Sequence, residues 1–190
     1  MGRLIYSAIA SLDGYTTDAD GRFDWSAPDE EVHGFINDLE RSVGTYLYGR
    51  RMYETMAVWE TDPELAEGSA VTGDYARIWR AADKIVYSTT LQSAETERTR
   101  IEQSFDADAV RRLKESTDAD LSIGGPTLAA DAIRAGLVDE WQLFVTPIIV
   151  GGGLGWLPDG VRIGLELLEE RRFAGGTTYL RYRTDRPAGR

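Results

Sequence analysis

A strand–helix–strand pattern in residues 120–145 constrains the fold more than any other part of the chain. A short, mainly apolar segment runs into Gly124, Gly125 and Pro126, and proline suits the first turn of a helix, where its missing N–H would have had no partner. Gly136 is expected to end that helix, because glycine readily adopts the left-handed conformation found just beyond a helix C-terminus. The apolar segment that follows predicts a second strand covered on both faces. Backbone N–H groups at a glycine-rich helix start can hold a phosphate, although paired glycines also make ordinary tight turns.

The same alternation of short strands and helices extends over the rest of the chain. The predicted strands are residues 4–10, 45–48, 84–87, 99–103, 120–123 and 141–145, followed by a hairpin of residues 165–173 and 177–184 that turns at Gly175 and Gly176. Helices are predicted between these strands, the first of them opened by a capping box at residues 26–29. The pattern predicts an α/β fold of three layers, with a mostly parallel central sheet, helices on both faces and a C-terminal antiparallel hairpin.

Other parts of the chain carry predictions of their own. Residues 15–25 are polar and predict a mobile loop, and residues 60–69 are acidic and predict a surface loop. In the helix predicted for residues 106–116, the spacing of apolar residues places Lys114 on the outward side. His33 lies beside the apolar stripe of the first helix, where a structural role is favoured over that of a general base.

Length and composition limit the classes of protein to which the chain can belong. Its 190 residues predict one domain of residues 1–184 with a flexible tail of residues 185–190. It has no cysteine, which excludes disulfides, zinc–thiolate sites and cysteine nucleophiles and fits a reducing, cytoplasmic location. A single histidine makes a multi-histidine metal site impossible, so no metal is predicted. The net charge of −11 argues against a nucleic-acid-binding face, and the lack of long apolar runs argues against a membrane partner.

Polar and glycine-rich segments follow four of the predicted strands. In chain order they are Ser11-Leu12-Asp13-Gly14, Gly49-Arg50-Arg51, Ser88-Thr89-Thr90 and Gly124-Gly125. Ligands of parallel sheets bind beyond the carboxyl ends of the strands, and guanidinium groups, hydroxyls and glycines suit an anion with several phosphates. The sequence therefore predicts a nucleotide site in which Arg50 and Arg51 are the most important cations. Each segment also has a plain structural interpretation, because arginines solvate helices and Ser or Thr residues cap them.

These segments, in this order, resemble those of a known family. The matching pieces are Ser11-Leu12-Asp13-Gly14, Gly49-Arg50-Arg51-Met52-Tyr53-Glu54, Lys84-Ile85-Val86-Tyr87-Ser88-Thr89-Thr90, Ile123-Gly124-Gly125-Pro126 and Pro147-Ile148-Ile149-Val150-Gly151-Gly152-Gly153. Over nearly its full length the chain resembles the dihydrofolate reductase-like fold, and more closely the C-terminal reductase domain of bacterial riboflavin-biosynthesis deaminase/reductases and their stand-alone relatives. The zinc-binding deaminase motif of the bifunctional enzymes is absent from the chain, because that motif requires cysteines.

The resemblance implies NADPH as the hydride donor and a set of residues that hold it. It implies that residues 49–51 meet the phosphate side of the cofactor, that Ser88 and Thr89 take the 2′-phosphate, and that the loop of residues 13–25 covers the nicotinamide. The full set of implied cofactor-binding residues is Gly14, Gly49, Arg50, Arg51, Ser88, Thr89, Thr90, Gly124, Gly125, Pro126 and Thr127. The implied substrate-binding residues are Asp13 and Trp25.

The catalytic acid departs from the family pattern. Folate reductases keep an acidic residue early in the helix after this loop, and here Asp29, Glu30 and Glu31 fall in that region. Helical phase favours Glu31 as the inward-facing residue, with Glu30 one position away, although the helix dipole alone also favours acids in a first turn. Asp13 is the other candidate, and a side-chain turn that holds the loop is its structural alternative. The catalytic candidates are therefore Asp13, Glu30 and Glu31.

The sequence leaves more than one function open. The leading hypothesis is an NADPH-dependent reductase that transfers hydride to a small heterocyclic or imine/carbonyl substrate of the riboflavin-precursor or pterin type. The alternative is a non-catalytic nucleotide-binding or structural module of the same fold, and a hydrolase that works through His33 is a third. A homodimer is also expected, because relatives of the riboflavin type are commonly dimers and residues 148–157 and 165–184 could pair across a two-fold axis.

Overall fold

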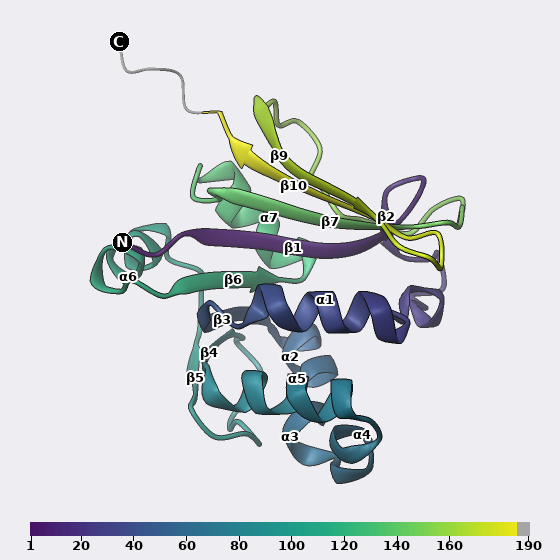
Figure 1. Ribbon diagram of the computed structural model, residues 1–190. Helices are drawn as coiled ribbons and strands as arrows, with labels where there is room; N and C mark the ends of the chain where they lie inside the picture. Colours follow the sequence, from purple (N-terminus) through teal and green to yellow (C-terminus); the bar gives the residue numbers. More distant parts are fainter. Residues whose placement is uncertain (186–190) are drawn as a thin grey trace.

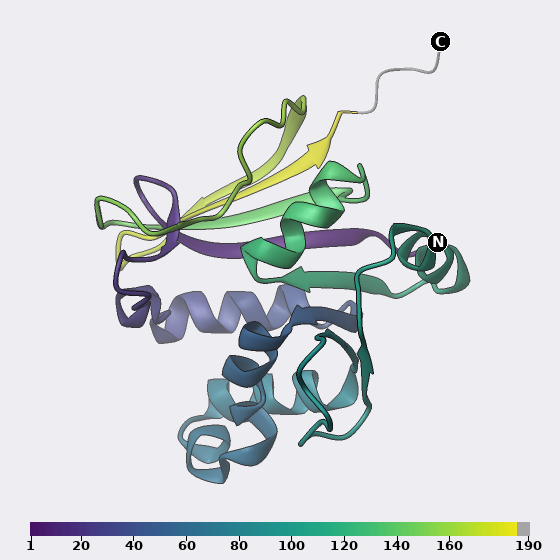
Figure 2. The ribbon, with the colours of Figure 1, turned by 180° about the vertical axis from the view of Figure 1, so that it is seen from behind.

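An eight-stranded mixed sheet with helices on both faces forms the centre of the molecule, in a computed structural model that describes residues 1–185 (Figures 1 and 2). The strands are β1 (Leu4–Ser11), β2 (Tyr15–Thr17), β3 (Val43–Gly49), β4 (Asp83–Tyr87), β5 (Thr99–Glu102), β6 (Asp120–Gly124), β7 (Glu140–Thr146), β8 (Leu154–Gly155), β9 (Leu165–Arg172) and β10 (Thr178–Thr184). The helices are η1 (Asp24–Ser26), α1 (Glu30–Glu40), α2 (Arg50–Met56), α3 (Val58–Thr61), α4 (Pro63–Glu67), α5 (Ala70–Ala81), α6 (Ala107–Ser116) and α7 (Pro126–Arg134).

The order of strands in the sheet is β5-β4-β3-β6-β1-β7-β10-β9. Pairing is parallel from β5 to β7 and antiparallel through β10 and β9, while β2 and β8 form a separate two-stranded ribbon. The predicted fold class, with its C-terminal antiparallel hairpin, is confirmed.

Two helical layers cover the faces of this sheet. One face is covered by α6 and α7 (Figure 2). These helices contribute to the core cluster that buries Leu121 and Ile123 of the central strand β6. On the other face lie α1 and α5, where Trp79 and Phe144 are almost completely buried (Figure 1). Every residue of β6 is buried because the strand lies between both layers, and each buried large apolar side chain contributes about 1.5–3 kcal/mol.

Two segments predicted as loops contain regular structure. Residues 60–69 include α4, which begins where the Asp62 side chain accepts a first-turn N–H and Pro63 occupies the first helical position. Within residues 15–25, β2 pairs with β8 and η1 follows, so the loop predicted to be mobile is fastened to a distant segment. The loop predicted for residues 60–69 was wrong because an Asp-Pro helix start outweighs acidic composition. The mobility predicted for residues 15–25 stays a prediction.

The start of α1 lies later than the capping box predicted for residues 26–29. Asp29 is the N-cap, and its Oδ1 accepts the Val32 N–H with an N···O distance of 2.9 Å. Ser26 belongs instead to η1, where its hydroxyl donates to the Phe23 carbonyl oxygen. Both Ser and Asp are good caps, so the turn that precedes the helix decides which of them is used.

Lys114 is buried, at 6% exposure, although the sequence predicted an outward side chain. Its Nζ donates to the Leu137 carbonyl oxygen at 2.9 Å and lies 2.5 Å from a carboxylate oxygen of Asp139. A buried ammonium group is stable only with such partners, and neither partner belongs to α6. The helical spacing of α6 therefore had no means of indicating that Lys114 turns inward.

The sheet takes its strands from nearly the whole length of the described chain, from residue 4 to residue 184. The Asp185 N–H donates to the Gly164 carbonyl oxygen at 2.8 Å, and the flexible tail predicted from residue 185 onward stays a prediction. The rest of the predicted tail, residues 186–190, lies outside the described residues. Among the helices of the described part, none has the length and apolar character needed to cross a membrane.

Glu40, the last residue of α1, is buried next to the tyrosines of β3. Its side chain is only 7% exposed, and within residues 1–185 its Oε2 atom has no hydrogen-bond partner. Burial raises the pKa of Glu40 from an ordinary 4.5 to about 7. The folded protein therefore keeps this carboxyl group protonated at pH values where the unfolded chain ionises it.

We expect this carboxyl group to make stability fall as pH rises. Below the unfolded pKa of 4.5, Glu40 is protonated in both the folded and the unfolded state. Between that pH and about 7, Glu40 ionises only in the unfolded state. This difference lowers the free energy of unfolding by up to about 3 kcal/mol. Glu40→Gln should remove this loss, measured by denaturant unfolding at about pH 4.5 and about pH 8. Glu115→Gln, at an exposed position, is the control and should keep the loss. An equal loss in Glu40→Gln would mean that the folded protein ionises Glu40.

Candidate functional site

The parallel strands β4, β3 and β6 end side by side. The border of the sheet formed by their carboxyl ends is the edge at which the candidate site lies. The last residue of β3 is paired with the last residue of β4, and the residue before it is paired with the last residue of β6. Parallel pairing in this register places the residues that follow the three strands, Arg50, Ser88 and Gly125, at the same edge. Three of the four segments predicted to form a site are thus brought together.

The fourth segment lies further out, because β1 extends beyond the other three strands. Tyr6 pairs with Ile123 of β6, yet the strand continues to Ser11, which pairs with Thr146 of β7. At about 3.3 Å per residue, Ser11 lies roughly 13 Å beyond the level at which β6 ends. The four segments form a long row, which suits an elongated ligand better than a compact anion.

The Arg50 side chain links the ends of β3 and β4. Its Nε donates to Glu54 Oε1 at 2.7 Å, one turn further along α2, and its Nη1 donates to Thr90 Oγ1 at 2.8 Å. Ser88 Oγ accepts the N–H groups of Thr90 and Leu91 and so caps its own turn. The two bonds to Glu54 and Thr90 use two of the five N–H donors of the Arg50 guanidinium group. The Arg50 side chain is about half exposed.

Three neighbouring side chains complete this part of the edge. Arg51 and Thr89, which the sequence predicted, are exposed, and within residues 1–185 neither side chain has a polar partner. Glu54 was not among the predicted site residues. Its spacing of four residues from Arg50 on a helix was the signal that could have identified it.

The two glycines at the end of β6 are required by packing. A Cβ on Gly124 would lie 2.8 Å from the ring of Tyr48, and Gly125 has a φ of +89° and would place a Cβ 3.3 Å from a methylene carbon of α2. The close approach of α7 to β3 and α2 therefore needs glycine whether or not a ligand binds. α7 begins at Pro126, and among residues 1–185 no side chain caps it, so its first-turn N–H groups, beside the exposed Thr127, have no side-chain acceptor in that part of the chain.

Asp13 fastens two loops at the end of β1. Its Oδ1 accepts the Val150 N–H at 3.1 Å and its Oδ2 accepts the Gly151 N–H at 2.7 Å. The hydroxyl of Ser11, followed by these two N–H groups, lowers the pKa of Asp13. Asp13 is therefore ionised at neutral pH. The next residue, Gly14, has a positive φ of +90°. Asp13 therefore holds its loop through a distant segment, and not through the local side-chain turn that was its structural alternative. A direct part in catalysis stays a prediction.

The two glutamates at the start of α1 are both exposed. Glu31 Oε2 accepts the Ala174 N–H at 3.0 Å, and its Oε1 lies 3.5 Å from Arg171 Nη2, so the side chain ties α1 to the β9–β10 turn. Glu30 is exposed. Glu31 was expected to turn inward, but its side chain is 44% exposed, whereas Val32 is buried. Catalytic roles for both glutamates stay predictions.

Trp25 lies in η1, which packs beside β1. Its indole Nε1 atom is buried, and within residues 1–185 it has no hydrogen-bond partner. A buried donor without an acceptor costs free energy, so this N–H is suited to an acceptor on a bound ligand. Substrate binding by Trp25 stays a prediction.

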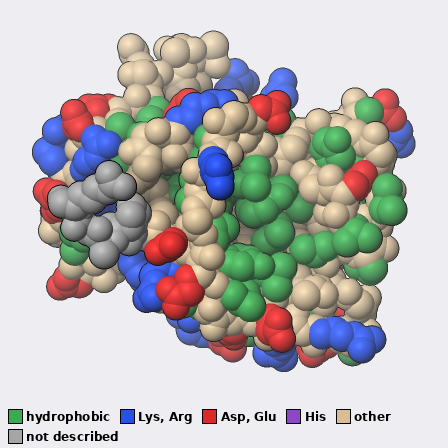
Figure 3. Space-filling model, turned by 90° about the horizontal axis from the view of Figure 1, so that it is seen from above, with side chains coloured by type: hydrophobic (Ala, Val, Ile, Leu, Met, Phe, Trp, Pro, Cys, Tyr) green, Lys and Arg blue, Asp and Glu red, His purple; other side chains and the backbone are tan. Residues whose placement is uncertain are grey.

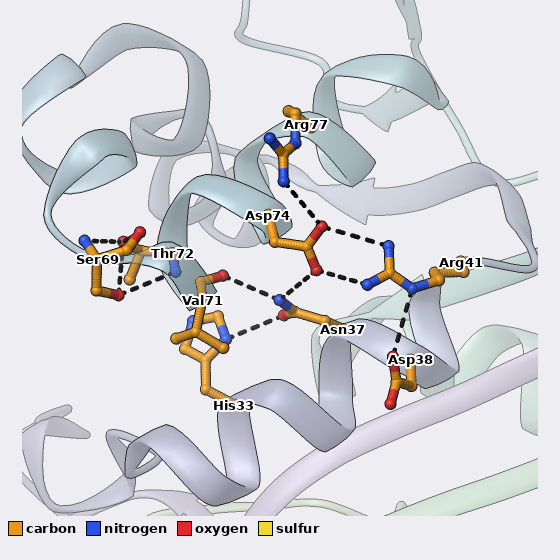
Figure 4. Close-up of polar contacts among 9 residues, drawn as sticks. All are labelled: His33, Asn37, Asp38, Arg41, Ser69, Val71, Thr72, Asp74 and Arg77. Atoms are coloured by element: carbon orange, nitrogen blue, oxygen red, sulfur yellow. Dashed lines mark hydrogen bonds and ion pairs between the residues drawn. The ribbon is translucent and has the colours of Figure 1, made fainter.

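His33 belongs to a polar network that joins α1 to α5 (Figure 4). Its Nδ1 lies 3.0 Å from Asn37 Oδ1, and Asn37 Nδ2 donates to Asp74 Oδ2 at 3.0 Å. Arg41 donates to the same carboxylate at 2.7 Å and lowers the pKa of Asp74. The histidine thus has the structural role that the sequence favoured, and the hydrolase hypothesis loses its basis.

We expect Asp13→Asn to loosen the loop that contains Val150 and Gly151. An amide oxygen accepts more weakly than a carboxylate, and the amide nitrogen cannot accept at all. Hydrogen–deuterium exchange at these two backbone amides should become several-fold faster, with the circular dichroism spectrum unchanged. Asp159→Asn, at an exposed position, is the control. Equal exchange rates in wild type and Asp13→Asn would contradict the fastening role.

Known proteins share sequence features and the fold with this chain. The family model described as the RibD C-terminal domain matches residues 3–179 of this chain. The uncharacterized protein YyaP of Bacillus subtilis (strain 168) is 27% identical over 182 residues, which cover 95% of this chain and 94% of that protein.

Solved structures share the fold. A protein of Shewanella sp. PV-4, provisionally named a riboflavin biosynthesis protein, superposes with a TM-score of 0.75 at 20% identity, over 97% of this chain and 99% of that one. A diaminohydroxyphosphoribosylaminopyrimidine deaminase/5-amino-6-(5-phosphoribosylamino)uracil reductase from Thermotoga maritima gives 0.64 at 17% identity, over 97% of this chain and 57% of that one. The match to residues 3–179 shows that the chain belongs to the RibD C-terminal domain family.

Proposed function

We propose that this chain is an NADPH-dependent reductase that transfers hydride to a small heterocyclic or imine/carbonyl substrate of the riboflavin-precursor or pterin type. The observation that carries the proposal is the inner part of the row of four segments, where Arg50, Thr90 and Ser88 lie beside the start of α7. Membership in the RibD C-terminal domain family supports the reaction class.

The residues along this row fit a phosphorylated nicotinamide dinucleotide. Arg50 and Arg51 bring two guanidinium groups, the first of them paired with Glu54, to one edge of a chain whose net charge is −11. We propose that they hold phosphate groups together with Ser88 and Thr89, and that the uncapped N–H groups of α7 hold the pyrophosphate. NADPH, when bound, would supply the hydride.

The outer part of the row is proposed to orient the substrate and exclude water. The β2–β8 ribbon and the bonds of Asp13 hold the loops beside the end of β1, and Trp25 offers its unpaired N–H there. Reduction also needs a proton. Asp13 and Glu31 are both held by backbone N–H groups, so we assign the proton donor to Glu30.

The test is NADPH oxidation, followed spectrophotometrically against dihydropterins, ribosylaminopyrimidines and simple imines. We expect turnover with at least one of these classes. Glu30→Gln should lower kcat by roughly 10²-fold, the usual size of a general-acid contribution, and leave NADPH affinity unchanged. Glu115→Gln is the control for the loss of one surface carboxylate.

Other outcomes have distinct meanings. Failure to bind NADPH at millimolar concentration would refute the proposal. Tight binding without oxidation in the presence of any substrate would favour the non-catalytic module. Full activity in Glu30→Gln would remove Glu30 alone as the donor.

We also propose a homodimer formed through the β9 edge. β9 is the last strand of the sheet, and its Leu165 and Leu167 are 40% and 47% exposed. Leu154 and Leu157, in the segment that leads into β9, are 43% and 42% exposed. Hydrophobic side chains gather into one patch on the face seen in Figure 3. An open edge strand with exposed leucines favours aggregation unless a partner covers it.

Light scattering at micromolar concentration tests the homodimer. We expect about twice the chain mass of 21.1 kDa for wild type. The double variant Leu165→Glu/Leu167→Glu should have the mass of one chain, because two buried carboxylates would oppose association. Leu65→Glu, which adds a charge at an exposed leucine of α4, should remain dimeric. A monomeric wild type would refute the proposal.

A further inference from the structure

Arg50 forms an ion pair with Glu54, and the carboxylate partly offsets the positive charge that Arg50 brings to the edge of the sheet. α2 places the two residues one turn apart, and Arg50 Nε donates to Glu54 Oε1 at 2.7 Å. The side chains are 49% and 48% exposed, so both face solvent beside the end of β3. The bond from Arg50 Nη1 to Thr90 Oγ1 holds the guanidinium group in place from its other side.

A ligand group that reaches Arg50 in this arrangement also meets a carboxylate. A phosphate monoester, which carries a charge of about −2 at neutral pH, is attracted by Arg50 and repelled by Glu54. A pair of ribose hydroxyls can instead accept from Arg50 and donate to Glu54 at the same time. Compared with an isolated arginine, the Arg50–Glu54 pair therefore shifts binding from a phosphate monoester toward the two hydroxyls of a ribose.

The doubly wound Rossmann domains, which also bind dinucleotides, use these two residue types for opposite purposes. An acidic residue near the ribose binds the 2′-hydroxyl of NAD, whereas an arginine accommodates the 2′-phosphate of NADP. Here both types occupy one turn of α2. Arg51 has no ion pair within the described residues, so the Arg50, Arg51 and Glu54 group keeps one net positive charge.

We propose that Glu54 determines how strongly this chain discriminates between NADPH and NADH. By pairing with Arg50 and accepting a bond from the ribose hydroxyls, Glu54 keeps the preference for the 2′-phosphate small, so both dinucleotides bind. This inference rests on the proposed function and specifies the cofactor range of the same site.

Isothermal titration calorimetry with 2′,5′-ADP and 5′-ADP tests the inference, because these fragments differ only in the 2′-phosphate. For the wild type we expect two dissociation constants within about tenfold of each other. Glu54→Gln keeps an acceptor for Arg50 Nε but removes the charge, and should shift the affinity ratio toward 2′,5′-ADP by roughly tenfold. Glu54→Ala should shift the ratio in the same direction.

Asp83→Asn is the matched control. Asp83, the first residue of β4, forms a similarly exposed ion pair with Arg98 at the amino end of the strand, with side-chain exposures of 54% and 53%. This variant loses the same charge and should keep the wild-type ratio, which separates a local effect from a change in net charge.

Two results would overturn the inference and leave the proposed function intact, provided that NADPH still binds. One is a ratio within twofold of wild type in both Glu54 variants. The other is a wild-type preference for 2′,5′-ADP of more than a hundredfold. A wild type that binds neither fragment nor NADPH would overturn the proposed function, and the inference with it.

Discussion

In-register parallel hydrogen bonding of β4, β3 and β6 is the constraint on which the rest of this structure depends. It ends three strands at one level, so that Arg50 and Thr90, which are 40 positions apart in the chain, can share a hydrogen bond. The alignment is strict because β6 is buried along its whole length, and buried backbone N–H and C=O groups must find partners in neighbouring strands. The candidate site is thus a consequence of how the sheet is paired.

The glycine pair at the end of β6 serves the fold before it serves any ligand. Gly124 leaves room for the ring of Tyr48, and Gly125 adopts a backbone conformation that other residues rarely adopt. The same absence of side chains exposes the start of α7 at the edge of the sheet. A packing requirement and an opening for phosphate groups therefore arise from one sequence feature, and the feature by itself does not distinguish them.

Two carboxylates that the sequence proposed as catalytic candidates hold distant segments together through hydrogen bonds to backbone N–H groups. Asp13 joins the loop after β1 to the backbone of residues 150–151, and Glu31 joins α1 to the β9–β10 turn. Hydride transfer from a bound cofactor depends mainly on orientation and on exclusion of water, and both require rigid loops. Acids that hold loops in place are consistent with a reductase of the proposed kind, in which the protein supplies position and few reacting groups.

The amino-acid pattern predicted the succession of the main strands and helices along the chain, the fold class, and four segments of a candidate site, three of which lie side by side in the structure. Periodicity and capping depend only on residues close in the chain, so these features could be read from the sequence. It did not determine that Lys114 turns inward to the Leu137 carbonyl, that β1 outruns β6, or that Glu54 and Thr90 hold Arg50. The tertiary structure decided these, because the energy of a buried charge or a side-chain hydrogen bond is set by the partners that packing provides.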